Sequence, residues 1–124
     1  MKRVIIDTNA LMAISQAKID IFGEIDKVMT FPYTAAILQG TIKELQQIQD
    51  TGSGKDKRAA KLALAILQAK KIAYVSGSPT SVDDALVECS RKGNLVLTQD
   101  TALKKRLTRP YLTIRQGNRI MMIK

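Results

Sequence analysis

The stretch RVIIDTNA, residues 3–10, decides the fold, because a run of strand-forming apolar residues ends abruptly in a carboxylate. The apolar run at 4–6 predicts a buried strand, and Asp7 follows it directly, with Thr8 and Asn9 behind. Asp and Asn side chains accept hydrogen bonds from nearby backbone and often begin helices. The stretch alone therefore predicts either a helix cap or a metal ligand at Asp7.

The composition predicts a globular protein with one domain over residues 1–124. A chain of 124 residues can bury a substantial core, and 45% of its residues are hydrophobic. No apolar run approaches the ~18 residues that a membrane-spanning helix needs, so we expect no membrane partner. The first residues do not resemble a signal peptide, and Cys89 is the single cysteine. We therefore expect a cytoplasmic location, where thiols stay reduced.

The charge balance favours a polyanionic partner. Twenty Lys and Arg residues against eleven Asp and Glu residues give a formal net charge of +9. Basic groups bind phosphates by displacing condensed counterions, so this excess is typical of nucleic-acid binding. A soluble surface that is basic without such a partner is the alternative explanation.

The absence of histidine excludes several kinds of active site. The sequence contains no histidine, so it cannot form a Ser–His–Asp triad, a Cys–His pair or a histidine acid–base pair for RNA cleavage. It also lacks the ligands of ordinary zinc sites. If the protein is an enzyme, carboxylates must carry the chemistry.

Strand-like and helix-like segments alternate along the chain. The predicted strands are 4–6, 30–33, 73–75, 95–97 and 111–114, with a further short strand at 120–123. The predicted helices are 11–25, 34–48, 58–71, 81–92 and 101–107, and 50–56 is expected to be an exposed loop. This alternation predicts right-handed crossovers and a mainly parallel sheet with helices on both faces, a three-layer α/β/α fold.

The acidic residues fall where such a sheet would bring them together. Asp7 ends the first strand and Asp100 follows the fourth, while Asp83 and Asp84 open the helix before the fourth strand. Glu44 lies beside the apolar stripe of its helix. Ligand sites in these sheets form outside the carboxyl ends of the strands. Taken singly, each acid has a simpler explanation, as a helix cap or a solvated helix residue.

Taken together, the acids favour a cation site. Like charges at close range raise one another's pKa unless a cation neutralises them. Ligation by oxygen atoms alone is typical of Mg²⁺ or Mn²⁺. An acidic site within a basic surface is the arrangement that a metal-dependent phosphodiesterase needs.

Four acidic segments carry a family resemblance: VIIDTNAL, TIKELQQI, SVDDALVE and LVLTQDTALKKRL. In order and spacing they resemble the acidic segments of the PIN-domain ribonucleases, and the resemblance covers essentially the whole chain. It implies a five-stranded parallel sheet with the first strand central. It also implies a Mg²⁺- or Mn²⁺-dependent endoribonuclease acting on single-stranded RNA, often as a homodimer.

The resemblance also implies roles for individual residues. The acidic, metal-binding and catalytic positions of the family match Asp7, Glu44, Asp84 and Asp100. The supporting polar positions match Thr8, Asn9 and Thr98. Because the third acid is doubled, Asp83 stays open as an alternative. The segment DALVE favours Asp84, since it resembles the family's acid followed by an apolar helix. The basic residues expected to guide the RNA backbone are Lys55, Lys57, Arg58, Lys104, Lys105 and Arg106.

Several functions remain open at this point. A small PIN-like domain without a zinc ribbon favours the toxin of a VapC-type toxin–antitoxin pair, with an antitoxin protein as partner. The segment LKKRLTRPYLTI also resembles PIN nucleases that process ribosomal RNA. From other classes, the chain could be a non-catalytic RNA-binding domain or a phospho-acceptor receiver domain, although the latter needs clustered acids after the first strand. The helix at 58–71 is apolar on more than one face, which predicts a dimer or partner surface.

Overall fold

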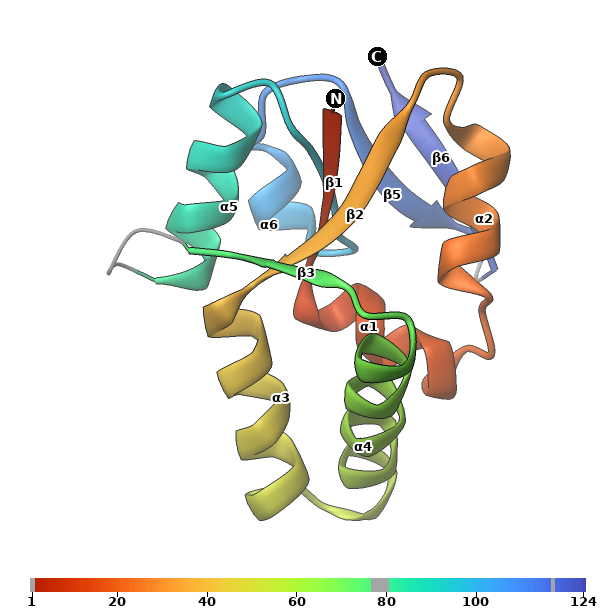
Figure 1. The fold of residues 1–124 in the computed structure, drawn as a ribbon, viewed down its shortest axis with the longest axis vertical. Helices are drawn as coiled ribbons and strands as arrows, with labels where there is room; N and C mark the ends of the chain where they lie inside the picture. Colours follow the sequence, from red (N-terminus) through yellow and green to blue (C-terminus); the bar gives the residue numbers. More distant parts are fainter. Residues whose placement is uncertain (1, 77–80, 117) are drawn as a thin grey trace.

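Six strands form one sheet in the computed structural model, which describes residues 2–76, 81–116 and 118–124 (Figure 1). The strands are β1 (Lys2–Ile6), β2 (Tyr33–Leu38), β3 (Ala73–Val75), β4 (Leu95–Leu97), β5 (Tyr111–Arg115) and β6 (Arg119–Ile123). The helices are α1 (Thr8–Gln16), α2 (Ile21–Val28), α3 (Gln39–Thr51), α4 (Gly54–Ala69), α5 (Val82–Arg91) and α6 (Thr101–Lys104). The strand order is β3-β2-β1-β4-β5-β6.

Strand β1 lies at the centre of the sheet, between β2 and β4. It pairs in parallel with both neighbours, with Ile5 opposite Ala36 and Ile6 opposite Leu97. Because both of its edges are paired and both faces are covered, its apolar run is completely buried. The central position expected for the first strand is thus confirmed, and it fixes the place of the residue that follows, Asp7.

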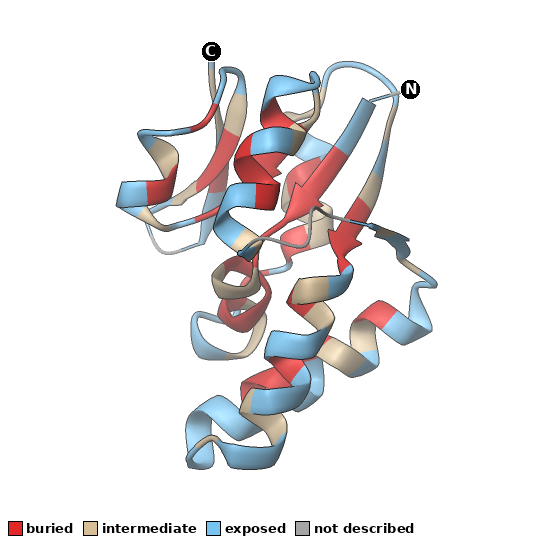
Figure 2. Cartoon of the chain, turned by 90° about the vertical axis from the view of Figure 1, so that its left-hand side faces the viewer, coloured by how far each residue is buried: buried red, intermediate tan, exposed pale blue. Residues whose placement is uncertain are grey.

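The helices cover both faces of the sheet. One core cluster joins the sheet to α1, α2, α3 and α4, and a second joins its other face to α5 and α6. Helices α3 and α4 form an antiparallel hairpin that projects beyond the carboxyl edge of the sheet (Figure 1). Buried residues gather on the strands and on the helix faces turned toward them, whereas the tip of this hairpin is exposed (Figure 2). The predicted three-layer α/β/α fold is confirmed.

The second strand and the helix after it differ from the prediction. The strand is Tyr33–Leu38 instead of 30–33, and the helix begins at Gln39 instead of near Thr34. The segment 34–38 pairs with β1 on one side and β3 on the other, so sheet pairing overrides its helical pattern. The true start of α3 also lacks a side-chain cap, because Leu38 occupies the cap position.

Other boundaries also moved. The predicted helix at 11–25 is two helices, because Lys18 adopts a positive φ of 54° and Asp20 caps a new helix by accepting a hydrogen bond from Gly23 N at 3.1 Å. The predicted loop at 50–56 shrinks to two residues between α3 and α4. The sheet has six strands instead of five, since β6 joins β5 in antiparallel orientation.

Helix α4 uses most of its apolar surface within the fold. Its alanines at 59, 60 and 63 and Leu67 are buried, and Leu64 is partly buried against the same core, while Leu62 is 42% exposed. Packing against α1 and α3 therefore accounts for most of the apolar character that predicted a dimer surface. In the described ranges, no helix combines the length and apolarity needed to cross a membrane.

Candidate active site

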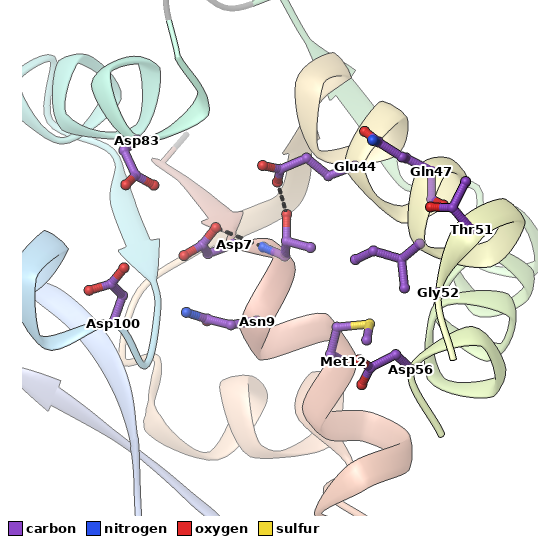
Figure 3. Close-up of a pocket in the computed structure, with 12 residues that line it drawn as sticks. Asp7, Asn9, Met12, Glu44, Gln47, Thr51, Gly52, Asp56, Asp83 and Asp100 are labelled. Carbon is purple, nitrogen blue, oxygen red and sulfur yellow. Dashed lines mark hydrogen bonds between the residues drawn. The ribbon is translucent and has the colours of Figure 1, made fainter. Parts of the chain in front are cut away.

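The carboxyl ends of β1 and β4 open into an acidic cleft of about 560 Å³ (Figure 3). Asp7 follows β1, Asp100 follows β4, and the two strands are direct neighbours. Five of the chain's eleven acids line the cleft. They are Asp7, Glu44, Asp56, Asp83 and Asp100. The convergence expected for Asp7 and Asp100 at one edge of the sheet is therefore present.

Asp7 caps helix α1 and also lines the cleft. One carboxylate oxygen, Oδ1, accepts a hydrogen bond from Thr8 N at 2.8 Å at the start of α1. The other, Oδ2, accepts from Thr98 Oγ1 at 2.7 Å. Burial raises the pKa of Asp7 above its usual value, and Asp83 and Glu44 add to the rise, while the two hydrogen bonds oppose it. The charge on Asp7 is thus costly here, which is the situation that a nearby cation relieves.

Thr98 is hydrogen-bonded to three residues that line the cleft. Its hydroxyl is completely buried, donates to Asp7, and accepts from Asp100 N at 3.1 Å and from Asn9 Nδ2 at 3.4 Å. A hydroxyl has one donor and two acceptor sites, so all its hydrogen-bonding capacity is used. Asn9 in turn accepts from Gln99 N at 3.1 Å. These contacts tie α1 to the segment after β4 and fix both aspartates.

Asp100 and Glu44 reach the cleft from different elements. Asp100 caps α6, with Oδ1 accepting from Leu103 N at 3.1 Å. Glu44 comes from α3, 36 residues beyond Thr8, and accepts a hydrogen bond from the Thr8 hydroxyl (Figure 3). Both residues were expected at the site, and the structure brings both to it along with Thr8.

Asp83 and Asp84, the two acids at the start of α5, lie in different surroundings. Asp83 lines the cleft. Asp84 instead forms an ion pair with Arg106, with 2.5 Å between Oδ1 and Nη2, and the guanidinium lowers the pKa of that carboxyl. Successive helix residues point about 100° apart, so only one of the two can face the sheet edge. The structure therefore places Asp83 among the residues that line the cleft, whereas Asp84 pairs with Arg106.

Six residues that line the cleft were missed from the sequence: Met12, Gln47, Ile48, Thr51, Gly52 and Asp56. Asp56 was assigned to an exposed loop, whereas it sits in the first turn of α4 and its Oδ1 accepts from Gln16 Nε2 at 2.7 Å. No local motif marks these positions. The packing of α1, α3 and α4 against one another places them, and it depends on contacts between distant parts of the chain.

The donor set of the cleft suits a hydrated divalent cation. Every acidic group offers oxygen, and no thiol is found among the described residues that line the cleft, which fits Mg²⁺ or Mn²⁺ better than a softer metal. Within the described ranges, no three carboxylates converge closely enough to enclose an ion by themselves. An ion bound here would therefore keep several waters, as Mg²⁺ commonly does in proteins.

The basic residues expected to contact RNA lie in two places outside the cleft. Lys55 and Arg58 line a hollow that meets the cleft at Asp56, and the exposed Lys57 lies between them in sequence on the same helix. Lys104 and Lys105 line a separate hollow beside α6 with Arg109, Tyr111 and two further residues. Lys104 is held in place there, since its Nζ donates to Thr113 Oγ1 at 3.3 Å.

Comparison with known proteins settles the family. A family model described as PIN like domain matches residues 4–116. The chain belongs to this family. Membership of the PIN-like family confirms the resemblance carried by the four acidic segments.

Two curated relatives and two solved structures are similar to this PIN-like domain. Ribonuclease VapC4 of Methanocaldococcus jannaschii is 28% identical over 123 residues, covering 94% of this chain and 92% of the relative. Ribonuclease VapC9 of Archaeoglobus fulgidus is 28% identical over 104 residues, covering 82% of this chain and 73% of the relative. The structure of the PIN domain endonuclease Utp24 superposes with a TM-score of 0.76 at 25% identity, covering 97% of this chain and 90% of that one. A domain of a functionally unknown protein from Methanocaldococcus jannaschii shares the fold alone, with a TM-score of 0.55 at 16% identity over 85% of this chain and 83% of that one.

Proposed function

We propose that this PIN-like domain is a divalent-metal-dependent endoribonuclease that hydrolyses single-stranded RNA. The observation that carries the proposal is the cleft at the carboxyl edge of the sheet, where five carboxylates gather in a chain with a net charge of +9. A non-catalytic RNA-binding surface gains nothing from carboxylates, because they repel phosphates. The names of the two curated relatives, both ribonucleases, support the same activity.

Asp7, Asp83, Asp100 and Glu44 are the residues that would hold Mg²⁺ or Mn²⁺. When bound, such an ion supplies an activated water and stabilises the charge that develops on the phosphate. Thr98 keeps Asp7 oriented and anchors the backbone at Asp100, so both carboxylates are in place before substrate arrives. Thr8 does the same for Glu44. This preorganisation means that little reorganisation energy is spent during the reaction.

The surrounding basic residues would bring RNA to the cleft. Lys55, Lys57 and Arg58 lie at one side, on α4, and Lys104 and Lys105 lie on and beside α6. Their contacts go to phosphates, so they position the strand without reading its bases. Arg106 is left out of this set, because Asp84 already pairs with it.

For the biological role we propose the toxin of a VapC-type toxin–antitoxin pair, a cytoplasmic homodimer that a small antitoxin protein inhibits. The two relatives named ribonuclease VapC support this role, since one of them aligns over nearly its whole length. Processing of ribosomal RNA stays the alternative that the basic segment at 103–114 favours.

Cleavage of an unstructured RNA oligonucleotide by the purified protein tests the proposed activity. We expect cleavage with added Mg²⁺ or Mn²⁺, none in excess chelator, and recovery when the ion is restored. Asp50→Asn is a matched control, because Asp50 is an exposed acid of α3 that does not line the cleft. Equal cleavage in chelator would exclude the metal, and RNA binding without any cleavage would favour a non-catalytic domain.

A further inference from the structure

The acidic cleft extends well beyond the four proposed metal ligands. Its other end is lined by Met12 of α1, by Gln47 and Ile48 of α3, and by Asp56 of α4. In Figure 3 this end lies to the right, separated from the Asp7, Asp83 and Asp100 side chains by the first turn of α1. A volume of about 560 Å³ is in the range of pockets that hold a small organic molecule. The cleft therefore has space for a nucleoside in addition to an ion.

Asp56 gives this end of the cleft its chemical character. Gln16 holds its Oδ1 at 2.7 Å, which orients the carboxylate and leaves acceptor capacity on both oxygens. Among the described residues, Asp56 forms no ion pair, although Lys55 and Arg58 are close to it in sequence. An acidic side chain in the first turn of a helix stabilises the helix dipole whichever way it points outward. This role therefore does not explain why Asp56 lines the cleft.

A phosphate does not suit this end, since Asp56 repels it, whereas a nucleobase does. Apolar Met12 and Ile48 can contact the face of a base, and Gln47 and Asp56 can bond to its edge. Among the four bases, only guanine presents two adjacent donors, N1–H and N2–H₂, which match the two oxygens of a carboxylate. Adenine and cytosine place an acceptor next to their amino group, and uracil flanks its single donor with two carbonyl oxygens.

We propose that the Met12–Asp56 end of the cleft is a base-binding subsite that selects guanine in the RNA strand. This inference rests on the proposed ribonuclease function and adds a sequence preference to it. The Asp56 carboxylate accepts hydrogen bonds from N1–H and N2–H₂ of guanine. The side-chain NH₂ group of Gln47 donates a hydrogen bond to guanine O6. A guanine seated there places a neighbouring phosphate at Asp7 and Asp100, because both ends belong to one continuous cleft.

Single-substitution oligonucleotides test the guanine subsite. We use an unstructured RNA of U and A with one central position that carries G, inosine, A, C or U, and measure cleavage beside that position in Mg²⁺. We expect the G substrate to be cleaved about tenfold faster than the A, C or U substrates, in line with one good bidentate base contact. Inosine lacks only the 2-amino group, so its rate should fall between those of G and A.

Two variants locate the preference. In Asp56→Asn the carboxylate loses one acceptor, so the G, inosine and A rates should become equal within about twofold. Asp50→Asn makes the same charge change outside the cleft and should keep the wild-type preference. Equal rates for all bases in the wild type, a preference for another base, or a preference for G that survives in Asp56→Asn would each overturn the proposal.

Binding separates failure of the subsite from failure of the nuclease function. Fluorescence anisotropy with the same oligonucleotides, without added metal, should show tighter binding of the G substrate to the wild type and no such difference for Asp56→Asn. If no RNA is cleaved but this difference is present, the ribonuclease proposal fails and the subsite stands. If RNA is cleaved and neither rate nor binding depends on the base, the subsite alone is overturned.

Discussion

Replacement of Thr98 by Val tests how the site is held together. Val has nearly the shape of Thr, so the change removes the hydroxyl and little else. In the wild type that hydroxyl donates to the buried Asp7 carboxylate at 2.7 Å and accepts from Asp100 N at 3.1 Å. The contact from Asn9 is longer, 3.4 Å, and should contribute little.

The expected cost at neutral pH is the sum of the two shorter bonds. A hydrogen bond to a charged group contributes about 1.5–3 kcal/mol, and a bond between neutral groups about 0.5–1.5 kcal/mol. Thr98→Val should therefore lower the free energy of unfolding by about 2–4.5 kcal/mol at pH 7. Because the Thr98 bond lowers the pKa of Asp7, the penalty should shrink as acid protonates Asp7.

Two other buried threonines serve as controls. Thr113 is completely buried and accepts one hydrogen bond, from Lys104 Nζ, so Thr113→Val should cost less than Thr98→Val. Thr41 is also completely buried, and within the described ranges its hydroxyl has no hydrogen-bond partner. Thr41→Val should therefore stabilise the fold, by about 1 kcal/mol. Urea unfolding followed by circular dichroism measures all three, and a cost for Thr98→Val below that for Thr113→Val would refute the reasoning.

Three further predictions follow from the site. Asp83→Asn should reduce the rate of RNA cleavage by at least about 100-fold, whereas Asp84→Asn should leave the rate within about threefold of the wild type. The reason is that Asp83 lines the cleft and Asp84 pairs with Arg106 instead. Cleavage assays with both variants would contradict this prediction if Asp84→Asn were the more damaging. Asp7→Asn should stabilise the metal-free fold at pH 7. The folded pKa of Asp7 lies above its usual 3.8, so ionisation costs stability as pH rises through the folded value, and the advantage of the Asn variant should vanish below pH 3.8. A constant advantage across a series of melts from pH 3 to pH 7 would disagree. RNA binding should weaken with salt at a log–log slope of about −0.7 per phosphate contact, and Lys55→Ala or Arg58→Ala should each make that slope shallower by about one contact. Titrations at several salt concentrations, with Lys27→Ala as a surface control outside both hollows, would contradict the basic path if all slopes were equal.

The sequence could predict those parts of the fold that depend on continuous local patterns of apolar and capping residues. The apolar run before Asp7 identified a buried strand, and the rule that parallel strands end at one edge brought Asp7 and Asp100 together. The start of α5 was clear because Ser81 caps it, with its Oγ accepting from Asp84 N at 3.2 Å. The strand and the helix start depend on residues close together in the chain, whereas the convergence of Asp7 and Asp100 follows from the general geometry of parallel sheets.

The parts that could not be predicted depend on partners far away in sequence. Asp83 and Asp84 differ by one helix position, and their separation is settled by Arg106, which is 22 residues beyond Asp84. The boundary between β2 and α3 is settled by pairing with β1 and β3, which no local pattern reveals. Asp56 joins the cleft only because α4 packs against α1, where Gln16 holds it.

Asp100→Asn, assayed with and without Mg²⁺, tests the central claim that the acidic cleft is the metal-dependent centre of a ribonuclease. Asn caps a helix about as well as Asp, so the start of α6 should be preserved while one charge is lost from the cleft. Mg²⁺ stabilises the protein by binding its folded state, so added Mg²⁺ should raise the melting temperature of the wild type. We predict that Asp100→Asn abolishes RNA cleavage, melts higher than the wild type without metal, and gains less from Mg²⁺. Wild-type cleavage rates and an unchanged response to Mg²⁺ in Asp100→Asn would contradict the account.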